Sequence, residues 1–482
     1  MKLKNKLHKT AIAVLIITVL GSLAWCRKPK TEEEDKPIVP IFYPIDVWTT
    51  SGDQSNLLKN QSAEFAKGKD ERFPVITVDT TQRFQTVDGF GFTLTGGSAY
   101  LINKLGPTDR DALLQELFGN KANSIGISYL RVSLGASDLS PSVFSYNDLF
   151  TGQTDLTLDK FSLSQDTLDL IPTLKRIIAI NPNIKIMASP WSPPTWMKTN
   201  NSSIGGTLKS QYFDVYARYF VKYIQQMRAN GITIDAVTLQ NEPEAGGNNP
   251  SMLMTAAQSI DFVKNNLGPA FKAANIATKI IVWDHNCDKP DYPISVLNDA
   301  AAKPFIDGSA FHLYAGDISA LSKVSSAHPD KNVYFTEQWT SGNGIFSADF
   351  KWHLTNVVIG SMRNKSKVAL EWNLASDASF SPRTPGGCTL CKGAITIEST
   401  TITRNVGYYI IGQVSKFVPS GSVRIASDLV GNFQTVAFQR ADGKKVLVVL
   451  NDGSSLQSFN INCHDKWITA ALAGGTAATY IW

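Results

Sequence analysis

Residues 184–239 contain the stretch that decides the fold. It opens with Ile184-Lys-Ile-Met-Ala188 and closes with Ala236-Val-Thr-Leu239, two short runs rich in apolar residues. Between them, residues 212–227 (YFDVYARYFVKYIQQM) place aromatic and aliphatic side chains on one face, at intervals of three and four residues. Such intervals predict an amphipathic helix, whereas short continuous apolar runs indicate strands buried on both faces. A strand, a helix and a second strand in this order are typical of a parallel sheet.

The same alternation recurs along most of the chain. Eight apolar, β-branched or aromatic runs can be identified, at residues 87–92, 129–134, 184–188, 236–239, 280–283, 310–313, 333–335 and 368–372. Helical patterns lie between most of them. Eight such units predict an α/β fold of the (β/α)8 TIM barrel type, whose active site lies at the carboxyl ends of the strands.

The pattern changes toward the carboxyl end of the chain. After a helix around residues 405–418, short strand patterns at 423–427, 433–440, 446–450 and 456–461 are separated by Asp-Gly and Asn-Asp-Gly turns. Turns of this kind join antiparallel strands. We therefore predict an appended antiparallel β-sandwich built from both chain ends. Residues 41–84 would supply its first strands, 85–404 the catalytic barrel, and 405–482 the last helix and the rest of the sandwich.

The composition is that of a globular protein. Of the 482 residues, 43% are hydrophobic and 18% are charged, which lies outside the ranges of disordered and fibrous chains. The net charge of +5 is small for a nucleic-acid-binding protein of this size. A mean hydropathy of -0.09 excludes a polytopic membrane protein. We expect a soluble enzyme or binding protein with no nucleic-acid partner.

The first 26 residues have the layout of a bacterial secretory signal. Lysines at positions 2, 4, 6 and 9 precede an apolar run at 11–20, which is too short to span a membrane. Leu23, three places before Cys26, resembles a lipobox in which the cysteine is acylated, although Trp25 stands where a small residue is usual. We predict a signal peptide of the lipoprotein type over residues 1–26 and a tether over 27–40. The protein would then be exported to the bacterial periplasm or cell surface, with a lipid anchor as its only membrane contact. A plain cleaved signal is the alternative.

Export makes disulfides possible. Cys388 and Cys391 form a lone C-x-x-C in a glycine-rich segment, with no second pair at zinc-finger spacing. A local disulfide that pins this loop is favoured over a redox or metal-binding role.

Two glutamates follow predicted barrel strands. Strand four ends in Leu239-Gln-Asn-Glu-Pro-Glu244, and strand seven ends in Tyr334-Phe-Thr-Glu-Gln-Trp339. Glu242 and Glu337 are therefore expected together at the catalytic rim. Glycoside hydrolysis needs such a pair, because one carboxyl donates a proton to the leaving oxygen while the other, ionised, attacks the anomeric carbon. Separate salt bridges at the rim are the alternative.

Aromatic side chains follow other strands, as a sugar site requires. Trp191 and Trp196 come after strand three, His312 and Tyr314 close strand six, and Trp372 ends strand eight. Aromatic planes pack against the apolar C–H faces of pyranose rings. Packing within the core or anchoring of a loop is the alternative, and we expect it for one of Trp191 and Trp196.

Together these motifs resemble glycoside hydrolase family 30, the retaining β-glycosidases that include glucosylceramidases and microbial β-1,6-glucanases. The matching segments span nearly the whole mature chain in the family's order: Asp88-Gly-Phe-Gly-Phe92, Leu130-Arg-Val-Ser133, Ala188-Ser-Pro-Trp-Ser-Pro-Pro-Thr-Trp196, Asn241-Glu-Pro243, His312-Leu-Tyr314, Thr336-Glu337 and Trp372-Asn-Leu-Ala375. The resemblance implies a barrel with a side β-sandwich formed by both chain ends.

The resemblance also implies residue roles. Glu242 would be the general acid/base, and Glu337 the nucleophile that carries a covalent glycosyl intermediate, with the two carboxyl groups about 5 Å apart. Arg131 and Tyr314 would hold Glu337 ionised and oriented. The remaining substrate contacts would be Asn241 to the sugar 2-hydroxyl, with Trp191, Trp372 and His312 around the glycone.

One departure from the family bears on the substrate. Where the glucosylceramidase branch has Thr-Asp-Ala, this chain has Thr95-Gly-Gly97, so Gly96 offers no side chain. We expect a glycone site that is more open or is organised by other loops. This segment and the C-x-x-C favour the bacterial β-1,6-glucanase branch, with β-linked glucan as substrate.

Two alternatives to a β-1,6-glucanase stay open. One is a glucosylceramidase or another β-glucosidase or β-xylosidase, and the other is a non-catalytic glycan-binding lipoprotein. The two carboxylates suffice for glycoside hydrolysis, so no cofactor is expected. No metal is expected either, because no histidine pair has ligand spacing.

Overall fold

In the computed structural model, which describes residues 45–482, eight parallel strands close into a barrel. In chain order they are β4 (Gly89–Thr93), β5 (Tyr129–Ser133), β6 (Lys185–Ser189), β7 (Ala236–Thr238), β8 (Lys279–Cys287), β9 (Ile306–Gly316), β10 (Asn332–Glu337) and β12 (Ser366–Asn373). Neighbours in the barrel follow chain order, and β12 closes it against β4. Each of the eight predicted runs corresponds to one of these strands, so the predicted TIM barrel is confirmed.

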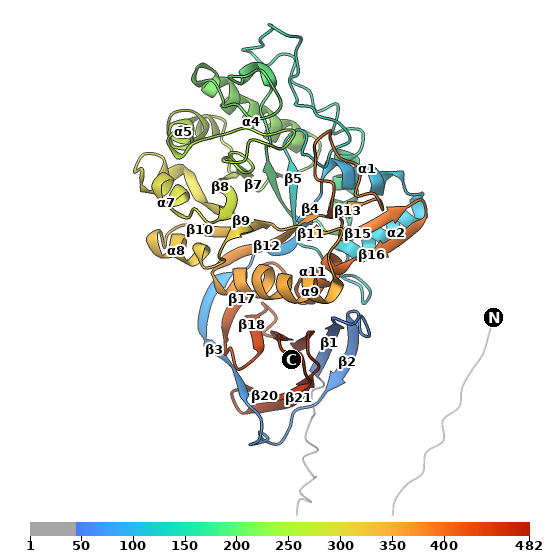
Figure 1. Cartoon of the computed structure of the whole chain (residues 1–482). Helices are drawn as coiled ribbons and strands as arrows, with labels where there is room; N and C mark the ends of the chain where they lie inside the picture. The colour runs from blue at the N-terminus through green and yellow to red at the C-terminus, as the bar shows by residue number, and fades with distance from the viewer. Residues whose placement is uncertain (1–44) are drawn as a thin grey trace, which may run out of the picture. The chain divides into compact units, whose positions relative to one another are not determined.

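Helices surround the barrel (Figure 1). They are α1 (Gly96–Lys104), α2 (Pro107–Phe118), α3 (Leu170–Ile180), α4 (Phe213–Ala229), α5 (Ala256–Phe262), α6 (Gly268–Ala273), α7 (Asp291–Asn298), α8 (Ala320–Ala327), α9 (Phe346–His353), α10 (Ser361–Arg363) and α11 (Val406–Ser415). In α4 the aromatic face is buried, with Tyr216, Phe220 and Tyr223 fully inaccessible. Asp214 in its first turn and Arg228 in its last complement the helix dipole. The helix therefore forms where the 212–227 pattern predicts it.

Alternate strand residues form two cores. Side chains that point into the barrel pack together as Tyr129, Met187, Ala236, Ile281, Ala310, Tyr334, Val368 and Leu370. Their neighbours in the strands, such as Leu130, Ile186 and Val237, pack outward against the helices. Burial on both faces explains why these strands read as continuous apolar runs.

The β-sandwich is built from both ends of the described chain. Its sheet order is β2-β1-β22-β19-β18-β17-β3-β20-β21. The strands are β1 (Ile45–Ser51), β2 (Lys59–Ala63), β3 (Val75–Thr86), β17 (Val423–Ser427), β18 (Phe433–Gln439), β19 (Lys445–Asn451), β20 (Gln457–Cys463), β21 (Lys466–Leu472) and β22 (Thr476–Ile481). The prediction of a sandwich from both ends is confirmed.

The pairing within the sandwich differs from the prediction in one respect. Strand β3 pairs antiparallel with β17 but parallel with β20, through Val75, Ile76 and Thr77. The parallel pair arises because β3 comes from the amino end and β20 from the carboxyl end, so no tight turn has to connect them.

Helix α11 joins the sandwich to the barrel (Figure 1). Its Gln413 side chain donates to the Thr50 hydroxyl of β1 and accepts from the Thr479 hydroxyl of β22, each at 2.7 Å. Arg363 of α10 donates to the carbonyl oxygens of Ser427 and Thr435. These bonds fix the two domains against each other through buried polar groups.

Small strands extend the carboxyl end of the barrel. Strand β11 (Thr340–Ser341) pairs with β14 (Cys391–Lys392), and β13 (Ala375–Ser376) joins β15 (Ile395–Glu398) and β16 (Thr401–Arg404). The predicted signal peptide of residues 1–26, the predicted acylation site Cys26 and the predicted tether of 27–40 lie outside the described residues. Over residues 45–482, none of the helices combines the length and apolar character needed to cross a bilayer.

Candidate active site

The carboxyl ends of β7 and β10 bring two glutamates together. Glu242 lies in the loop after β7, and Glu337 is the last residue of β10. One carboxylate oxygen of each, together with an imidazole nitrogen of His312, lie within 4.8 Å of one another. Retaining glycosidases hold their two carboxyl groups about 5 Å apart, whereas inverting enzymes leave a wider gap for a water molecule. The observed spacing suits direct attack by one of the two carboxylates.

Two donors orient the carboxylate of Glu337. Nη1 of Arg131 donates to its Oε2 at 2.5 Å, and the hydroxyl of Tyr314 donates to its Oε1 at 2.9 Å. Donors aimed at both oxygens favour the ionised form and fix the plane of the group. These are the contacts that the family resemblance implies for Arg131 and Tyr314.

Arg131 lies fully buried beneath the site. Its Nη2 donates to Oδ1 of Asn241 at 2.6 Å and to Oδ2 of Asp284 at 2.8 Å. The rings of Trp191 and Trp372, whose centroids are 5.4 Å apart, lie 4.9 and 5.7 Å from the guanidinium carbon. One cation thus holds an amide, a carboxylate and two aromatic rings in fixed relative positions.

Sequence reasoning missed Asp284, which follows the predicted run 280–283 directly. Its carboxylate is fully buried and accepts hydrogen bonds from Arg131, Ser189, Thr238 and Thr336, with His312 a fifth partner. Burial alone would raise the pKa of Asp284, but the charge of Arg131 and the His312 bond outweigh it and hold that pKa well below its usual range. The rule that singled out Glu242 and Glu337, a carboxylate at a strand's carboxyl end, would have found it.

The backbone is strained where these carboxylates are presented. Glu242 has φ 47°, and the consecutive residues Trp283 and Asp284 have φ 76° and 59°. Residues with side chains rarely adopt this left-handed region, and each instance costs on the order of 1–3 kcal/mol. Such strain persists only where surrounding contacts impose it, as the buried bonds of Asp284 do here.

His312 lies between the carboxylates. Its Nδ1 is 3.1 Å from Oε1 of Glu242, and its Nε2 is 3.2 Å from Oδ1 of Asp284. Burial opposes protonation, but the negative charges of Glu337, Asp284 and Glu242 outweigh it and raise the pKa of His312 to about 9. At neutral pH both ring nitrogens therefore carry protons, and each donates to a carboxylate.

Glu242 and Glu337 release their protons as a coupled system, because each charge acts on the other at this distance. For Glu242, burial raises the pKa, but the hydrogen bond and charge of His312 outweigh burial and bring it below its ordinary value. For Glu337, burial outweighs the favourable charges of His312 and Arg131, so its pKa is raised. The lower pKa of the pair therefore belongs to Glu242, which His312 contacts directly, and the higher pKa belongs to the more deeply buried Glu337.

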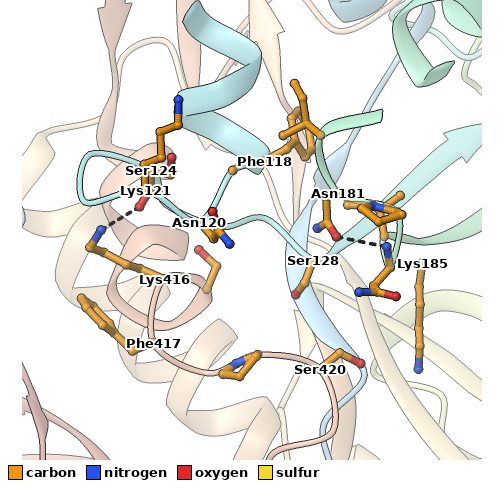
Figure 2. A pocket seen from close by; sticks show the side chains of 18 of the residues that line it. Phe118, Asn120, Lys121, Ser124, Ser128, Asn181, Lys185, Lys416, Phe417 and Ser420 are labelled. Carbon is orange, nitrogen blue, oxygen red and sulfur yellow. Dashed lines mark hydrogen bonds between the residues drawn. The ribbon is translucent and has the colours of Figure 1, made fainter. Parts of the chain in front are cut away.

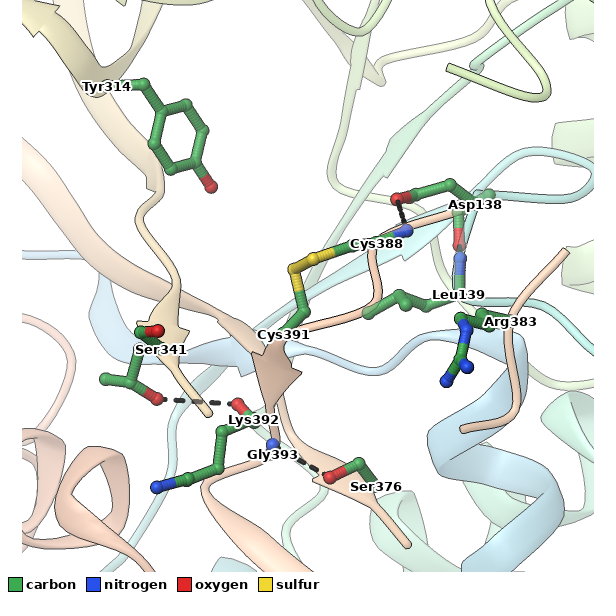
Figure 3. Close-up of a disulfide and its surroundings, with 12 residues drawn as sticks. Asp138, Leu139, Tyr314, Ser341, Ser376, Arg383, Cys388, Cys391, Lys392 and Gly393 are labelled. Carbon is green, nitrogen blue, oxygen red and sulfur yellow. Dashed lines mark hydrogen bonds between the residues drawn. A yellow bond between two sulfur atoms is a disulfide. The ribbon is translucent and has the colours of Figure 1, made fainter. Parts of the chain in front are cut away.

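A further carboxyl group that was also missed from the sequence is that of Asp138 (Figure 3). Asp138, in the loop after β5, is 5% exposed and its Oδ2 accepts from the backbone N–H of Cys388 at 3.2 Å. Burial, together with the negative charges of Glu337 and Glu242, raises the pKa of Asp138 to about 7. Its sequence signal is again a carboxylate in the loop after a barrel strand, in Gly135-Ala-Ser-Asp138.

Asp138 also changes the interpretation of Gly96. A Cβ at Gly96 would lie 2.9 Å from the Ser140 hydroxyl, and one at Gly97 would lie 2.7 Å from the Leu139 carbonyl oxygen. These glycines therefore let helix α1 pack closely against the loop that carries Asp138. Of the two expectations for the glycone site, more open or organised by other loops, this packing favours the second, with the Asp138 loop as the candidate.

The two tryptophans after β6 have different surroundings. Trp191 packs against Trp372 over Arg131, whereas Trp196 donates its Nε1–H to the carbonyl and side-chain oxygens of Asn147. Trp196 therefore anchors the loop, as expected for one of the pair. Both are nearly inaccessible, so Trp191 offers a sugar only its ring edge or a small part of its face.

Cys388 and Cys391 form a disulfide, as favoured from the sequence (Figure 3). Cys287 and Cys463 are buried free thiols. The disulfide lies next to the Trp191–Trp372 pair, with Cys391 in the same small apolar cluster.

Among the residues that the structure describes, Glu242, His312 and Glu337 form the one group of three potential metal ligands. Arg131 already donates to Glu337, and Nδ1 of His312 already bonds to Glu242. A metal ion would have to displace the imidazole proton and tolerate the guanidinium charge nearby. The set therefore suits proton transfer better than metal binding.

A cavity of about 1030 Å³ lies at the other end of the barrel, between residues 118–128, 180–185 and 415–420 (Figure 2). Lys416 there donates to the carbonyl oxygens of Ala122 and Ser124, and Lys185 bonds to Asp88. Catalysis in TIM barrels occurs at the carboxyl ends of the strands. This cavity is therefore separate from the candidate active site.

A closed barrel that presents two close carboxylates at the carboxyl ends of its strands has the arrangement that a glycoside hydrolase needs. Residues 87–418 match the glycosyl hydrolase family 30 TIM-barrel domain, and residues 421–480 match the beta sandwich domain of that family. The chain belongs to glycosyl hydrolase family 30, and the resemblance drawn from its motifs is confirmed.

Curated relatives and solved structures show which members this chain is similar to. It is 34% identical to an endo-1,6-beta-D-glucanase of Neurospora crassa over 397 residues, covering 78% of this chain and 81% of that protein. It is 29% identical to the lysosomal acid glucosylceramidase of Mus musculus over 433 residues, covering 85% and 83%. A solved endo-beta1,6-glucanase superimposes with a TM-score of 0.85 at 34% identity, covering 91% of this chain and 99% of that one.

Proposed function

We propose that the enzyme hydrolyses β-1,6-linked glucan with retention of anomeric configuration. The observation that carries this proposal is the close Glu242–Glu337 pair, with Arg131 and Tyr314 both donating to Glu337. Glu337 has the fixed orientation that a nucleophile needs. Glu242 has fewer direct partners and a side chain that is 13% exposed, which suits a group that exchanges protons with the leaving oxygen and then with water.

Double displacement then proceeds in two steps. The higher pKa of the pair belongs to Glu337 in the unliganded site, so the first step requires the shared proton to move to Glu242 when the substrate binds. An oxygen of Glu337 then attacks the anomeric carbon while Glu242 donates that proton to the departing glycosidic oxygen. Glu242 next removes a proton from water, which attacks the same carbon and releases Glu337. Because Oδ1 of Asn241 accepts from Arg131, its amide N–H2 group is the part that can donate to the sugar 2-hydroxyl. Trp191, Trp372, His312 and Asp138 would complete the glycone site.

The choice of β-1,6-glucan rests on the relatives. Endo-1,6-β-glucanases match at 32–34% identity, whereas the lysosomal acid glucosylceramidase of Mus musculus matches at 29%. Reducing-end release from purified β-1,6-glucan tests this choice, with glucosylceramide and an aryl β-glucoside as parallel substrates. We expect rapid release of short oligosaccharides from the glucan. No release from the glucan, with turnover of glucosylceramide, would assign the chain to the other branch.

The catalytic role of Glu337 is tested by Glu337→Gln. We expect glucan hydrolysis to fall by at least ~10³-fold, because the amide cannot form the glycosyl intermediate. Glu244→Gln is the matched control, since Glu244 lies at the same rim but pairs with Lys289. Equal activity of the wild type and Glu337→Gln would reject the mechanism. Glucan binding without turnover by the wild type would indicate a non-catalytic glycan-binding protein.

We also propose export with a lipid anchor at Cys26. Leu23 and Cys26 supply two positions of a lipobox. Labelling of cells with a palmitate analogue tests acylation, with Cys26→Ala as the control. Label in the wild type alone is expected, and an unlabelled, released wild type would indicate a plain cleaved signal.

A further inference from the structure

The turn closed by the Cys388–Cys391 disulfide contacts the active site on several sides. Residues 384–392 run over the carboxyl end of the barrel, between the loop that carries Asp138 and strand β11, which follows Glu337 closely in the chain (Figure 3). The segment contains none of the residues that take part in the reaction proposed above. Its contacts nevertheless converge on groups that surround the sugar site.

The first set of contacts holds Asp138 at both side chain and backbone. The N–H of Cys388 donates to the carboxylate Oδ2 at 3.2 Å, and the N–H of Thr384 donates to the carbonyl oxygen of Asp138 at 2.9 Å. A Cβ at Gly387 would lie 2.3 Å from that same carbonyl oxygen. The turn therefore contacts Asp138 so closely that a change in the backbone conformation of residues 384–388 would move the Asp138 side chain.

The second set of contacts supports the aromatic pair and the strand segment after Glu337. Cys391 forms a buried cluster with Leu139, Trp191 and Trp372, against which Cys388 packs. Strand β14 begins at Cys391 and pairs with Ser341 of β11, and Gly342 donates to the carbonyl oxygen of Leu390. The disulfide thus joins the Asp138 contact at one end of the turn to the Trp372 side of the pocket at the other.

We propose that the Cys388–Cys391 disulfide, packed against the Trp191–Trp372 pair, is a positioning device that sets Asp138 for the sugar ring whose anomeric carbon reacts. This inference rests on the proposed glycosidase function. The disulfide joins residues three positions apart, so it restricts the unfolded chain less than a disulfide between distant segments. Its contribution to the free energy of unfolding is therefore small. Displacements of about 1 Å in a preorganised site cost up to ~10²-fold in rate.

A double-mutant cycle tests the proposal. The variant Cys388→Ser/Cys391→Ser opens the turn, Asp138→Ala removes the group that it holds, and the third variant combines them. We expect the opened turn to lower kcat/KM by about 10-fold or more in the wild-type background, and by less than about 3-fold when Asp138 is already absent. Equal fold-changes in the two backgrounds, or no effect of opening the turn, would overturn the proposal.

Thr389→Ala is the matched control, because Thr389 lies within the same turn, is exposed, and leaves the disulfide intact. It should retain wild-type kcat/KM. If the serine variant fails to fold, the folded wild type is reduced with a phosphine and assayed directly. A loss of kcat/KM that reverses on reoxidation supports the proposal, and unchanged activity of the reduced enzyme contradicts it.

The cycle is run on β-1,6-glucan and on an aryl β-glucoside, because both place a glycone beside Asp138. Wild-type turnover of the aryl glucoside alone rejects the proposed glucan substrate, and the cycle on that glucoside still decides the role of the disulfide. Wild-type turnover of glucan that is unchanged in the opened turn rejects only the inference about the disulfide.

Discussion

The two ends of the barrel carry similar charged pairs in different surroundings. At the amino ends of the strands, Lys185 pairs with Asp88 and Lys279 with Asp307, and these side chains are between 12% and 39% exposed. At the carboxyl end, the side chains of Arg131 and Asp284 have no exposed surface. Solvated pairs are worth about 1 kcal/mol or less, whereas a buried charge that loses its partner costs about 3–5 kcal/mol. Of these pairs, the fully buried one therefore lies at the carboxyl end of the barrel, where the candidate active site is.

The largest effect is expected from removing the buried counter-charge, by Asp284→Ala. The change leaves Arg131 and His312 without a shared acceptor, so the free energy of unfolding should fall by about 3–5 kcal/mol. It should also release Glu337 and Glu242 from their fixed positions, and lower kcat by ~10²-fold or more. Urea unfolding and glucan hydrolysis measure the two effects.

Lys185→Met is the control at the opposite end. Because this lysine is partly solvated, we expect a loss below about 1 kcal/mol and unchanged kcat. A loss in Lys185→Met as large as that in Asp284→Ala would contradict the distinction between the two ends.

A second effect follows from the raised pKa of His312, about 9 in the folded protein against about 6.5 in an unfolded chain. The resulting stability is fully present below pH 6.5 and is lost as the pH rises through 9, a total of about 3 kcal/mol. Unfolding free energies of the wild type and His312→Gln, measured from pH 6 to 9.5, should converge as the pH rises. A constant difference between the two free energies over this pH range would show that His312 has the same pKa in the folded and the unfolded protein.

A third effect isolates one hydrogen bond to Glu337. Tyr314 is 37% exposed, and its hydroxyl donates to Oε1 of the carboxylate. In Tyr314→Phe the bond is lost while little packing changes, so kcat/KM should fall about 10- to 100-fold, as a charged hydrogen bond of 1.5–3 kcal/mol implies. The melting temperature should stay close to that of the wild type. A large drop in melting temperature with normal kcat would assign Tyr314 a structural role.

Periodicity was sufficient to predict the barrel because its strands are buried on both sides. Residues 184–188 and 236–239 are apolar except for Lys185 and Thr238, and tight turns in the carboxyl region separate its strands clearly. The parallel pairing of β3 with β20 has no such local signal. It joins residues from opposite chain ends, and only tertiary packing determines it.

The site was predictable where its residues lie in recognisable strand-end motifs, as Glu242 and Glu337 do. Asp284 lies toward the carboxyl end of β8 and Asp138 follows β5, but their importance comes from partners far away in the chain. Asp284 becomes prominent only once Arg131 and His312 are seen to converge on it. The position of the Asp138 carboxylate depends on a hydrogen bond from Cys388, which lies 250 residues later in the chain.

The smallest effect concerns the glycines of α1, which sequence reasoning connected with an open sugar site. The structure instead places the Cβ of Gly96→Ala 2.9 Å from the Ser140 hydroxyl, so the helix or the Asp138 loop has to shift slightly. We expect a loss of at most about 1–2 kcal/mol in the free energy of unfolding, typical of mild overpacking, with KM for glucan nearly unchanged. Asp138→Asn should instead raise KM with little loss of stability, because the role proposed for its side chain is to contact the sugar. The contrary result would be that Gly96→Ala raises KM as much as Asp138→Asn does. That result would show that the sugar binds next to Gly96, and that helix α1 rather than the Asp138 loop shapes the glycone site.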